Sequence, residues 1–276
     1  MDKRPSSRVN LDRAIMRLYG GDARYVEIRS IVANAVVGQF LTDGVVKGGS
    51  ALRLRYGIQA SRVTVDFDTA RGGDVESFVA SISEGLRNGW SGFSGEVVRR
   101  KAAAPKDVPE QYVMLPFDVK LKYMRQPWCT VRLEVGYDEI GDAREADEFI
   151  SDEVRGIFRA LCLEEPKPIP LMTLAHQVAQ KLHGVSEPGS GRAHDLVDLQ
   201  LIFARSSVDV REVRRIAERL FANRRRQPWP PKVEKGQGWD SLYSAAAGGL
   251  DVLPSCDEAV AWVNELVERI ASAQTP

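Results

Sequence analysis

The chain has 276 residues, 43% of them hydrophobic and 28% charged, which is typical of a soluble globular protein with one large domain or two modest ones. Basic and acidic residues number 38 each, so the net charge is zero and gives no sign of a globally basic nucleic-acid-binding protein. The three cysteines lie far apart and form no Cys-x-x-Cys pair, which indicates reduced thiols in a cytoplasmic protein and argues against a disulfide framework or a zinc site.

The chain begins with a short charged segment, residues 1–5, and no apolar core of a signal peptide follows it. No later stretch approaches the roughly 20 consecutive apolar residues that a membrane span needs. We therefore expect a cytoplasmic protein that has no membrane partner.

Helix and strand patterns alternate in the first part of the chain. Two helices are expected first, over residues 10–19 and 23–41, with Asn10 and Asp22 as their N-caps. Ser50 is expected to cap the next helix. The strands expected in this part are residues 45–47, 62–69, 95–101, 111–123 and 130–137, and its later helices are residues 51–56 and 75–86.

The second part of the chain is almost wholly helical in pattern. The run at residues 164–170, which holds three prolines, is the strongest linker signal, and a second break lies at residues 224–238. Residues 142–163 show a mixed pattern. The helices expected here are residues 171–184, 193–204, 209–223 and 257–273. We predict an α+β fold in which a mixed β-sheet flanked by helices, residues 1–165, precedes a helical C-terminal domain, residues 166–276.

A turn of small residues and two carboxylates form the first candidate site. A helix is expected to begin at the turn formed by Gly48, Gly49 and Ser50, and the backbone N–H groups at a helix N-terminus can bind phosphate. Asp66 and Asp68 are one residue apart on the expected strand, so they can converge on one point, where they repel unless a cation lies between them. A phosphate-binding site beside a metal-binding site is the minimum that phosphoryl or nucleotidyl transfer requires. The alternative is an ordinary turn followed by a solvated strand end.

Glu134 is a single acidic residue inside an apolar strand, where its burial is costly unless it is paired or bound to metal. A third carboxylate from a neighbouring strand would complete a two-metal site. The alternative places Glu134 on an edge strand, paired with Arg132 or Lys122. Arg62 is expected on the same strand face as Asp66, which makes it a candidate nucleotide contact.

Charged residues also occur close to the apolar side of the C-terminal helices. Lys181 lies at the border of an apolar stripe, from which a lysine can reach triphosphate oxygens or simply solvate the helix edge. Asp195 and Asp198 are three residues apart and share one helix face, although Asp195 also suits a plain capping role. The sequence has neither a His-Glu-x-x-His nor a Gly-x-Ser-x-Gly motif, which argues against zinc and serine hydrolysis.

Basic residues gather locally in spite of the zero net charge, and each group could contact an RNA or nucleotide backbone. The groups are Arg53, Arg55 and Arg62; residues 99–101; Lys120 and Lys122; Arg211, Arg214 and Arg215; and residues 224–226. The last group lies next to Trp229, which would allow stacking on a base. A solvated charged face is the usual alternative.

These motifs together resemble those of the AbiEii-type nucleotidyltransferase toxins, a family of the DNA polymerase β-like nucleotidyltransferase superfamily. The first motif of that family is similar to residues 47–54 followed by residues 62–68. Two later motifs are similar to Lys181-Leu182-His183 and to residues 192–199, in the same order, and His194 stands where the family usually has Lys or Arg. The resemblance runs from about residue 45 to about residue 201.

The resemblance implies a bacterial toxin, of a toxin–antitoxin or phage-defence pair, that transfers a nucleotide from an NTP to an acceptor, expected to be the 3′ end of tRNA. It implies a cognate antitoxin encoded nearby. Asp66 and Asp68 would bind Mg²⁺ or Mn²⁺, with Glu134 as third ligand. The residues of the small turn would bind phosphates, Lys181 would neutralise the triphosphate, and Asp195 would act on the acceptor hydroxyl or position Lys181. Two alternatives stay open: a catalytically silent module that binds RNA or protein, and transfer to a protein or small molecule.

Overall fold

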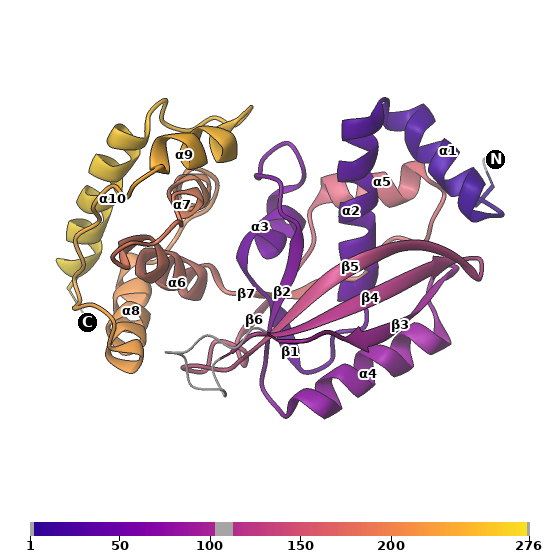
Figure 1. Ribbon diagram of the computed structural model, residues 1–276, viewed down its shortest axis with the longest axis horizontal. Helices are drawn as coiled ribbons and strands as arrows, with labels where there is room; N and C mark the ends of the chain where they lie inside the picture. The colour runs from indigo at the N-terminus through magenta and orange to yellow at the C-terminus, as the bar shows by residue number, and fades with distance from the viewer. Residues whose placement is uncertain (1–2, 103–112, 275–276) are drawn as a thin grey trace. The chain divides into compact units, whose positions relative to one another are not determined.

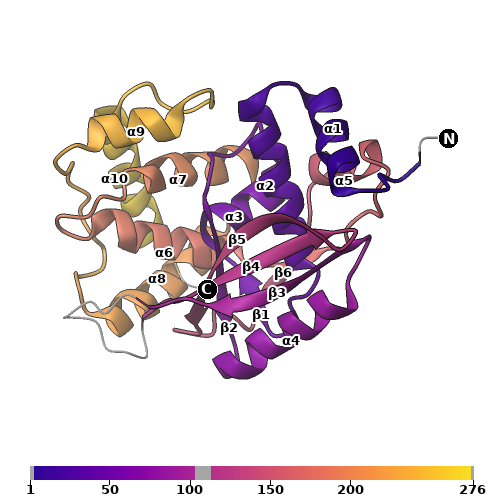
Figure 2. The ribbon, with the colours of Figure 1, turned by 45° about the vertical axis from the view of Figure 1, so that its right-hand side comes forward.

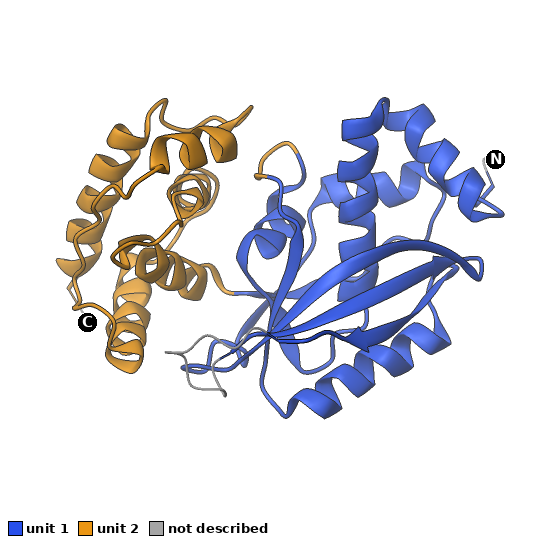
Figure 3. Cartoon of the chain, in the orientation of Figure 1, with its two compact units in different colours: residues 1–58, 63–172 blue, residues 59–62, 173–276 orange. Residues whose placement is uncertain are grey.

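The computed structural model describes residues 3–102 and 113–274. It divides into two compact units, residues 1–58 with 63–172 and residues 59–62 with 173–276 (Figure 3). Residues 169–172 form a strand of the sheet, so the first unit extends beyond the border predicted at residue 165. In the described residues, no helix is long and apolar enough to cross a membrane.

The first unit contains a mixed seven-stranded sheet in the order β3-β4-β5-β2-β1-β7-β6 (Figure 1). Its strands are β1 (Gly44–Val46), β2 (Asp66–Arg71), β3 (Phe93–Arg99), β4 (Leu115–Tyr123), β5 (Gln126–Tyr137), β6 (Ala146–Phe149) and β7 (Ile169–Met172). The pairs β2–β5 and β1–β7 are parallel, and the other neighbours are antiparallel. The prediction of a mixed sheet flanked by helices is therefore confirmed.

The helices of the first unit share one apolar core with the sheet. They are α1 (Arg8–Tyr19), α2 (Asp22–Gly38), α3 (Gly48–Tyr56), α4 (Val75–Asn88) and α5 (Asp152–Ala160). Figure 1 and Figure 2 both show α1, α2 and α5 together on one side of the strands and α4 beside β3. Alternation along the strands sends Phe67 and Leu133 into this core, so their polar neighbours in the chain lie on the opposite face of the sheet.

Three predicted N-caps are wrong by a few residues. The hydroxyl of Ser7, not Asn10, caps α1 by accepting a hydrogen bond from the backbone N–H of Asn10. Helix α2 begins at Asp22, which leaves Gly21 as the capping residue. Helix α3 begins at Gly48, so Ser50 lies inside its first turn and does not cap it.

The strand that carries the two aspartates begins later than predicted. Val63 and Val65 suit a strand by propensity, yet they are 62% and 71% exposed and lie outside the ladder, which starts at Asp66. Propensity alone does not form a strand: residues 59–62 belong to the second unit, and backbone pairing with β5 starts only at Asp66. Asp66 and Asp68 therefore lie at the start of strand β2 and not at its end.

The second unit is helical, as predicted, and contains α6 (Leu174–Ser186), α7 (His194–Arg205), α8 (Val210–Arg224), α9 (Trp239–Ala247) and α10 (Cys256–Ala271). Helix α9 follows the predicted break at 224–238 and was not expected. The predicted helix over residues 171–184 is wrong at its start, because strand β7 extends to Met172 and Thr173 then caps α6. The predicted mixed segment, 142–163, contains β6 and α5, and residues 111–112 of a predicted strand lie outside the described residues.

Candidate active site

Three carboxylates lie on the same polar face of the sheet in the first unit. In the parallel ladder of β2 and β5, Asp68 is paired in register with Glu134, and Asp66 with Arg132. Strand residues two apart share a face, so Asp66, Asp68 and Glu134 lie on one side of the sheet. Burial raises the pKa of Glu134 above its usual range, and the charges of Asp66 and Asp68 raise it further. Because β5 lies between β4 and β2, the alternative of an edge strand for Glu134 is wrong.

The turn before α3 is tied directly to this carboxylate strand. The backbone N–H of Lys47 donates to the carbonyl of Asp68 at 2.8 Å, and the hydroxyl of Ser50 donates to the carbonyl of Asp66 at 2.6 Å. Gly48 has a φ of +64°, and a Cβ placed on it would lie 2.7 Å from Oδ2 of Asp68. Only glycine allows this backbone conformation and this approach together. The N-terminus of α3 and the Asp68 carboxylate are therefore held side by side.

Ser50 has its own structural task within this arrangement. Its side chain is fully buried, and its hydroxyl donates a hydrogen bond to the backbone carbonyl of Asp66. The hydroxyl thus fixes the start of β2 relative to α3. The predicted contact between Ser50 and phosphate stays a prediction, whereas the first N–H groups of α3 point outward from the helix N-terminus as that prediction requires.

The donor chemistry of the acidic face suits a hard divalent cation. Mg²⁺ and Mn²⁺ prefer carboxylate oxygens, and a cation would relieve the repulsion that raises the pKa of Glu134. Within residues 3–102 and 113–274, however, no three Asp, Glu, His or Cys side chains are close enough together to hold a metal ion as they stand. The face has the right ligands, and they would have to draw together around the metal.

A second charged cluster lies in the second unit, around Lys181. Its ammonium donates to Oδ1 of Asp195 at 3.1 Å and to Oδ2 of Asp198 at 2.6 Å, and its side chain is only 4% exposed. The guanidinium of Arg192 binds the other oxygen of Asp195 at 2.6 Å. Arg62 binds both oxygens of Asp198 at 3.0 Å. Three cations therefore alternate with two buried carboxylates in one network, of which Arg192 is the exposed end.

The electrostatics of this network keep the carboxylate of Asp195 ionised. Complete burial alone would raise the pKa of Asp195, but Lys181 and Arg192 hold it well below its usual range. His194, next to Asp195 in the chain, has a lowered pKa, first because of burial, so it favours the neutral form. A neutral His194 adds no lasting positive charge at the position where relatives usually have Lys or Arg.

Several predictions for these residues change. Lys181 is buried between two aspartates, so the interpretation of it as a solvated helix edge is wrong. Arg62 does not share the strand face of Asp66, because its guanidinium is engaged by Asp198; its contact with a nucleotide stays a prediction. Arg192 was overlooked, although its spacing of three from Asp195 on the chain is a recognisable pairing signal.

The local basic groups also have structural partners. Arg53 is buried in the first unit, so it does not lie on an exposed charged face, and its predicted contact with a nucleotide or RNA backbone stays a prediction. Arg55 binds Asp147 at 2.7 Å. In the second unit, Trp229 packs edge-on against Phe221 with ring centroids 5.2 Å apart. The predicted stacking of a base on Trp229 stays a prediction.

The model of the family described as "Nucleotidyl transferase AbiEii toxin, Type IV TA system" matches residues 31–262 of the chain. The chain belongs to this AbiEii nucleotidyltransferase toxin family. The resemblance predicted from the motifs is thereby confirmed, and the family region extends well past residue 201, where recognisable motifs ended. The protein is thus a nucleotidyltransferase of the toxin type, whose family pairs a toxin with an antitoxin.

The chain was also matched with solved structures. MenT4, the nucleotidyltransferase toxin Rv2826c from Mycobacterium tuberculosis H37Rv, is 18% identical with a TM-score of 0.54, and the match covers 96% of this chain and 98% of that one. JHP933 from Helicobacter pylori is 15% identical with a TM-score of 0.45, covering 89% of this chain and 91% of that one. A search of the curated proteins gave no match. The likeness to MenT4 supports the α+β fold.

Proposed function

We propose that this protein transfers a nucleoside monophosphate from an NTP to the 3′ end of an RNA acceptor, tRNA in particular. It would act in the bacterial cytoplasm as the toxin of a toxin–antitoxin or phage-defence pair. The observation that carries the proposal is the close approach of Gly48 to the carboxylate of Asp68, because it places a helix N-terminus beside an acidic strand face. Family membership supports the reaction class.

The acidic face would hold the metal. Asp66 and Asp68 are the proposed ligands of Mg²⁺ or Mn²⁺, with Glu134 as the third, since their oxygens are the donors that these cations prefer. When bound, the metal would offset the triphosphate charge and lower the pKa of the acceptor hydroxyl. The chain's own contribution is to keep the ligands on one face, where the ladder between β2 and β5 fixes their register.

The remaining roles follow from contacts within each unit. The N–H groups at the start of α3 bind phosphate oxygens, and Ser50 fixes the turn that presents them. Lys181 neutralises triphosphate charge, and Asp195 and Asp198 hold its ammonium in one place. The acceptor hydroxyl loses its proton, its oxygen bonds to the α-phosphorus, and the bond to the pyrophosphate oxygen breaks in line with the attack.

Labelled transfer tests this function. The protein is incubated with each α-³²P NTP, Mg²⁺ or Mn²⁺, and total RNA together with cell protein. We expect the label to enter RNA of tRNA size and to be removed by a 3′ exonuclease. Label that enters protein instead would overturn the RNA acceptor but not the transferase. Absence of any transfer with either metal would contradict the proposed metal-dependent reaction.

A matched pair of variants controls this experiment. Asp66→Asn removes one proposed metal ligand without changing the side-chain volume, and transfer should fall by at least about a hundredfold, as for other groups that act on transition-state charge. Glu96→Gln removes an exposed carboxylate from β3 of the same sheet and should leave transfer unchanged. Equal activity of the two variants would refute the assignment of Asp66.

A further inference from the structure

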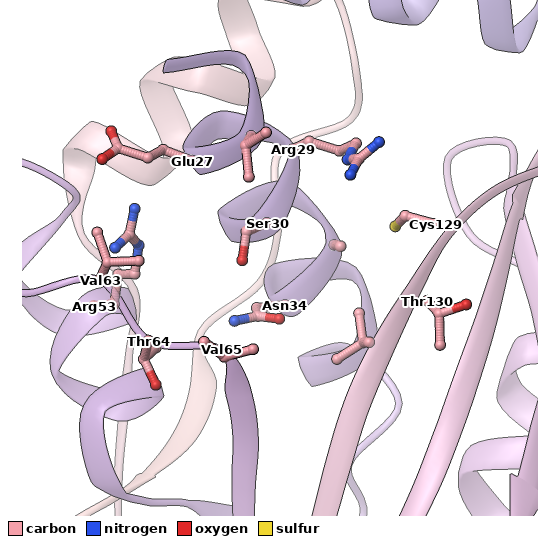
Figure 4. Close-up of a pocket in the computed structure, with 13 residues that line it drawn as sticks. Glu27, Arg29, Ser30, Asn34, Arg53, Val63, Thr64, Val65, Cys129 and Thr130 are labelled. Atoms are coloured by element: carbon pink, nitrogen blue, oxygen red, sulfur yellow. The ribbon is translucent and has the colours of Figure 1, made fainter. Parts of the chain in front are cut away.

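A cavity of about 280 Å³ lies in the first unit, outside the acidic face (Figure 4). Helix α2 and Arg53 of α3 form one side, β5 forms another, and the extended residues 63–65 form a third. Val131 of β5 is buried in the helix-covered core, whereas the next residue, Arg132, is paired with Asp66 on the opposite face. The cavity is therefore on the helix side of the sheet and is distinct from the carboxylate face.

The wall formed by α2 and α3 is polar and positively charged. Arg53 is only 1% exposed, and burial lowers its pKa, while Glu27 and Glu153 partly offset this effect. Glu27 is itself hydrogen-bonded to Arg24 at 2.9 Å, and Arg29 adds another cation to the cavity wall. Among the residues that line the cavity, Arg29 and Arg53 are cationic and Glu27 is anionic, so an anion in the cavity meets a net positive charge.

Neutral hydrogen-bonding groups stand next to this charge. Asn34 is 5% exposed, and its amide lines the cavity together with the hydroxyl of Ser30 one turn earlier on α2. Figure 4 shows both side chains directed into the space between α2 and the segment of Thr64 and Val65. Arg53 stands at the same end of that space. A phosphate or carboxylate here could accept from a guanidinium, an amide and a hydroxyl.

The cavity wall also has an apolar part. Val63 and Val65 are strongly exposed for β-branched residues, and both line the cavity, as does Val26 of α2. Apolar side chains together with a few cationic and polar groups are the usual composition of a site for a small amphiphilic ligand. A volume of about 280 Å³ is at the small end of such sites and suits a small ligand with one anionic group.

We propose that this cavity binds a nucleoside monophosphate group, with its phosphate against Arg53, Asn34 and Ser30 and its ring against Val63 and Val65. The group can come from a free mononucleotide or from the terminal nucleotide of an RNA. Binding needs no divalent metal, because the wall that meets the phosphate is cationic. The bound ring contacts residues 63–65, which lead directly into Asp66 at the start of β2.

The proposal is tested by calorimetric titration of the full chain with AMP and UMP in EDTA, which removes metal-dependent binding at the carboxylates. Saturable binding is expected, with inorganic phosphate alone and adenosine alone each binding at least about tenfold more weakly. The proposal would be overturned if neither AMP nor UMP shows saturable binding at concentrations up to about 10 mM. Affinities much weaker than this are at the limit of what calorimetry can measure.

Variants at the exposed rim locate the binding without disturbing the core. Val63→Glu and Val65→Glu place a negative charge at the apolar wall and should weaken AMP binding about tenfold or more, whereas Val63→Lys should not weaken it. Val98→Glu, on β3 and outside the cavity, is the matched control. Unchanged binding in both glutamate variants at the cavity would also overturn the proposal.

A competition arm identifies the source of the nucleotide. If a short RNA oligonucleotide displaces AMP from the cavity, the natural ligand is the terminal nucleotide of an RNA. If the oligonucleotide does not displace AMP, the natural ligand is a free mononucleotide. The outcome is independent of the proposed transfer reaction, because binding is measured in EDTA and without turnover. Loss of transfer in Asp66→Asn therefore leaves this result untouched.

Discussion

Arg62 holds Asp198 through two parallel hydrogen bonds, from Nε to Oδ1 and from Nη2 to Oδ2, each 3.0 Å long. The same carboxylate accepts from Lys181 at 2.6 Å and is almost fully buried. Arg62 stands at the end of residues 59–62, the short segment that belongs to the second unit although its flanking residues belong to the first. A residue predicted to lie on the strand of Asp66 therefore supports the buried network of Lys181 instead.

We expect Arg62→Ala to lower the free energy of unfolding by about 1–3 kcal/mol, because it removes a bidentate partner from a buried carboxylate. Arg62 is partly exposed, which keeps the loss below that of a fully buried pair. Denaturant unfolding of the full chain measures the effect. The control is Arg215→Ala, which breaks an exposed pair with Glu212 and should cost less than about 1 kcal/mol. Equal losses in the two variants would mean that the bidentate geometry contributes nothing.

Lys181→Met should leave two buried carboxylates with one cation each and cost about 3 kcal/mol or more of stability. Nucleotide transfer should also be lost, because the proposed charge on the triphosphate disappears. In the double variant Lys181→Met with Asp198→Asn, part of the stability should return while transfer stays lost. Recovery of transfer in the double variant would show that Lys181 serves only to neutralise Asp198, and its role toward the nucleotide would be refuted.

Local signals predicted the two most informative segments of the chain. The run of small residues at Gly48 predicted a turn that opens a helix, and the spacing of Asp66 and Asp68 follows from the period of a strand, so the turn and the strand were both expected at these residues. The start of that strand was placed too early, because Val63 and Val65 have strand propensity but lie outside the ladder of β2 and β5.

Long-range partners could not be predicted in the same way. Arg62 and Asp198 are 136 residues apart, and no local pattern reports that they bind each other. Strand β7 begins within the charged, proline-rich run at residues 164–170, which was predicted to be a linker. The strand nevertheless pairs with β1, more than a hundred residues earlier in the chain. The burial of Lys181 likewise depends on the partners that α7 supplies. Tertiary contact, not propensity, decided each of these cases.

The stability of the first unit should depend on pH through Asp142. This side chain is fully buried, and burial raises its pKa from 3.8 to about 6, partly opposed by Lys47 and reinforced by Asp138. Because the folded-state pKa exceeds the unfolded value, the folded state binds the proton more tightly; this contribution to stability is complete below about pH 4 and is lost as the pH rises through about 6.

Asp142→Asn tests this expectation, since the amide keeps an oxygen that can accept from the N–H of Glu139. The variant should gain about 1–3 kcal/mol over the parent protein at pH 7 and little at pH 4. Denaturant unfolding at the two pH values measures the difference, with Glu96→Gln as an exposed control. A gain of the same size at both pH values would show that burial of the charge is not its cause.

Gly48→Ala should damage both fold and activity, because the new methyl group would lie 2.7 Å from Oδ2 of Asp68 at a residue whose φ is +64°. Gly189→Ala is the matched control, since Gly189 has a similar φ of +73° but open space within 4 Å of the position that a methyl group would take. The control should cost about 1 kcal/mol, the strain of positive φ alone. Gly48→Ala should cost more than that and should lower nucleotide transfer at temperatures where it stays folded. If both variants lose the same stability and both keep full transfer, the contact between Gly48 and Asp68 has no part in positioning the carboxylate.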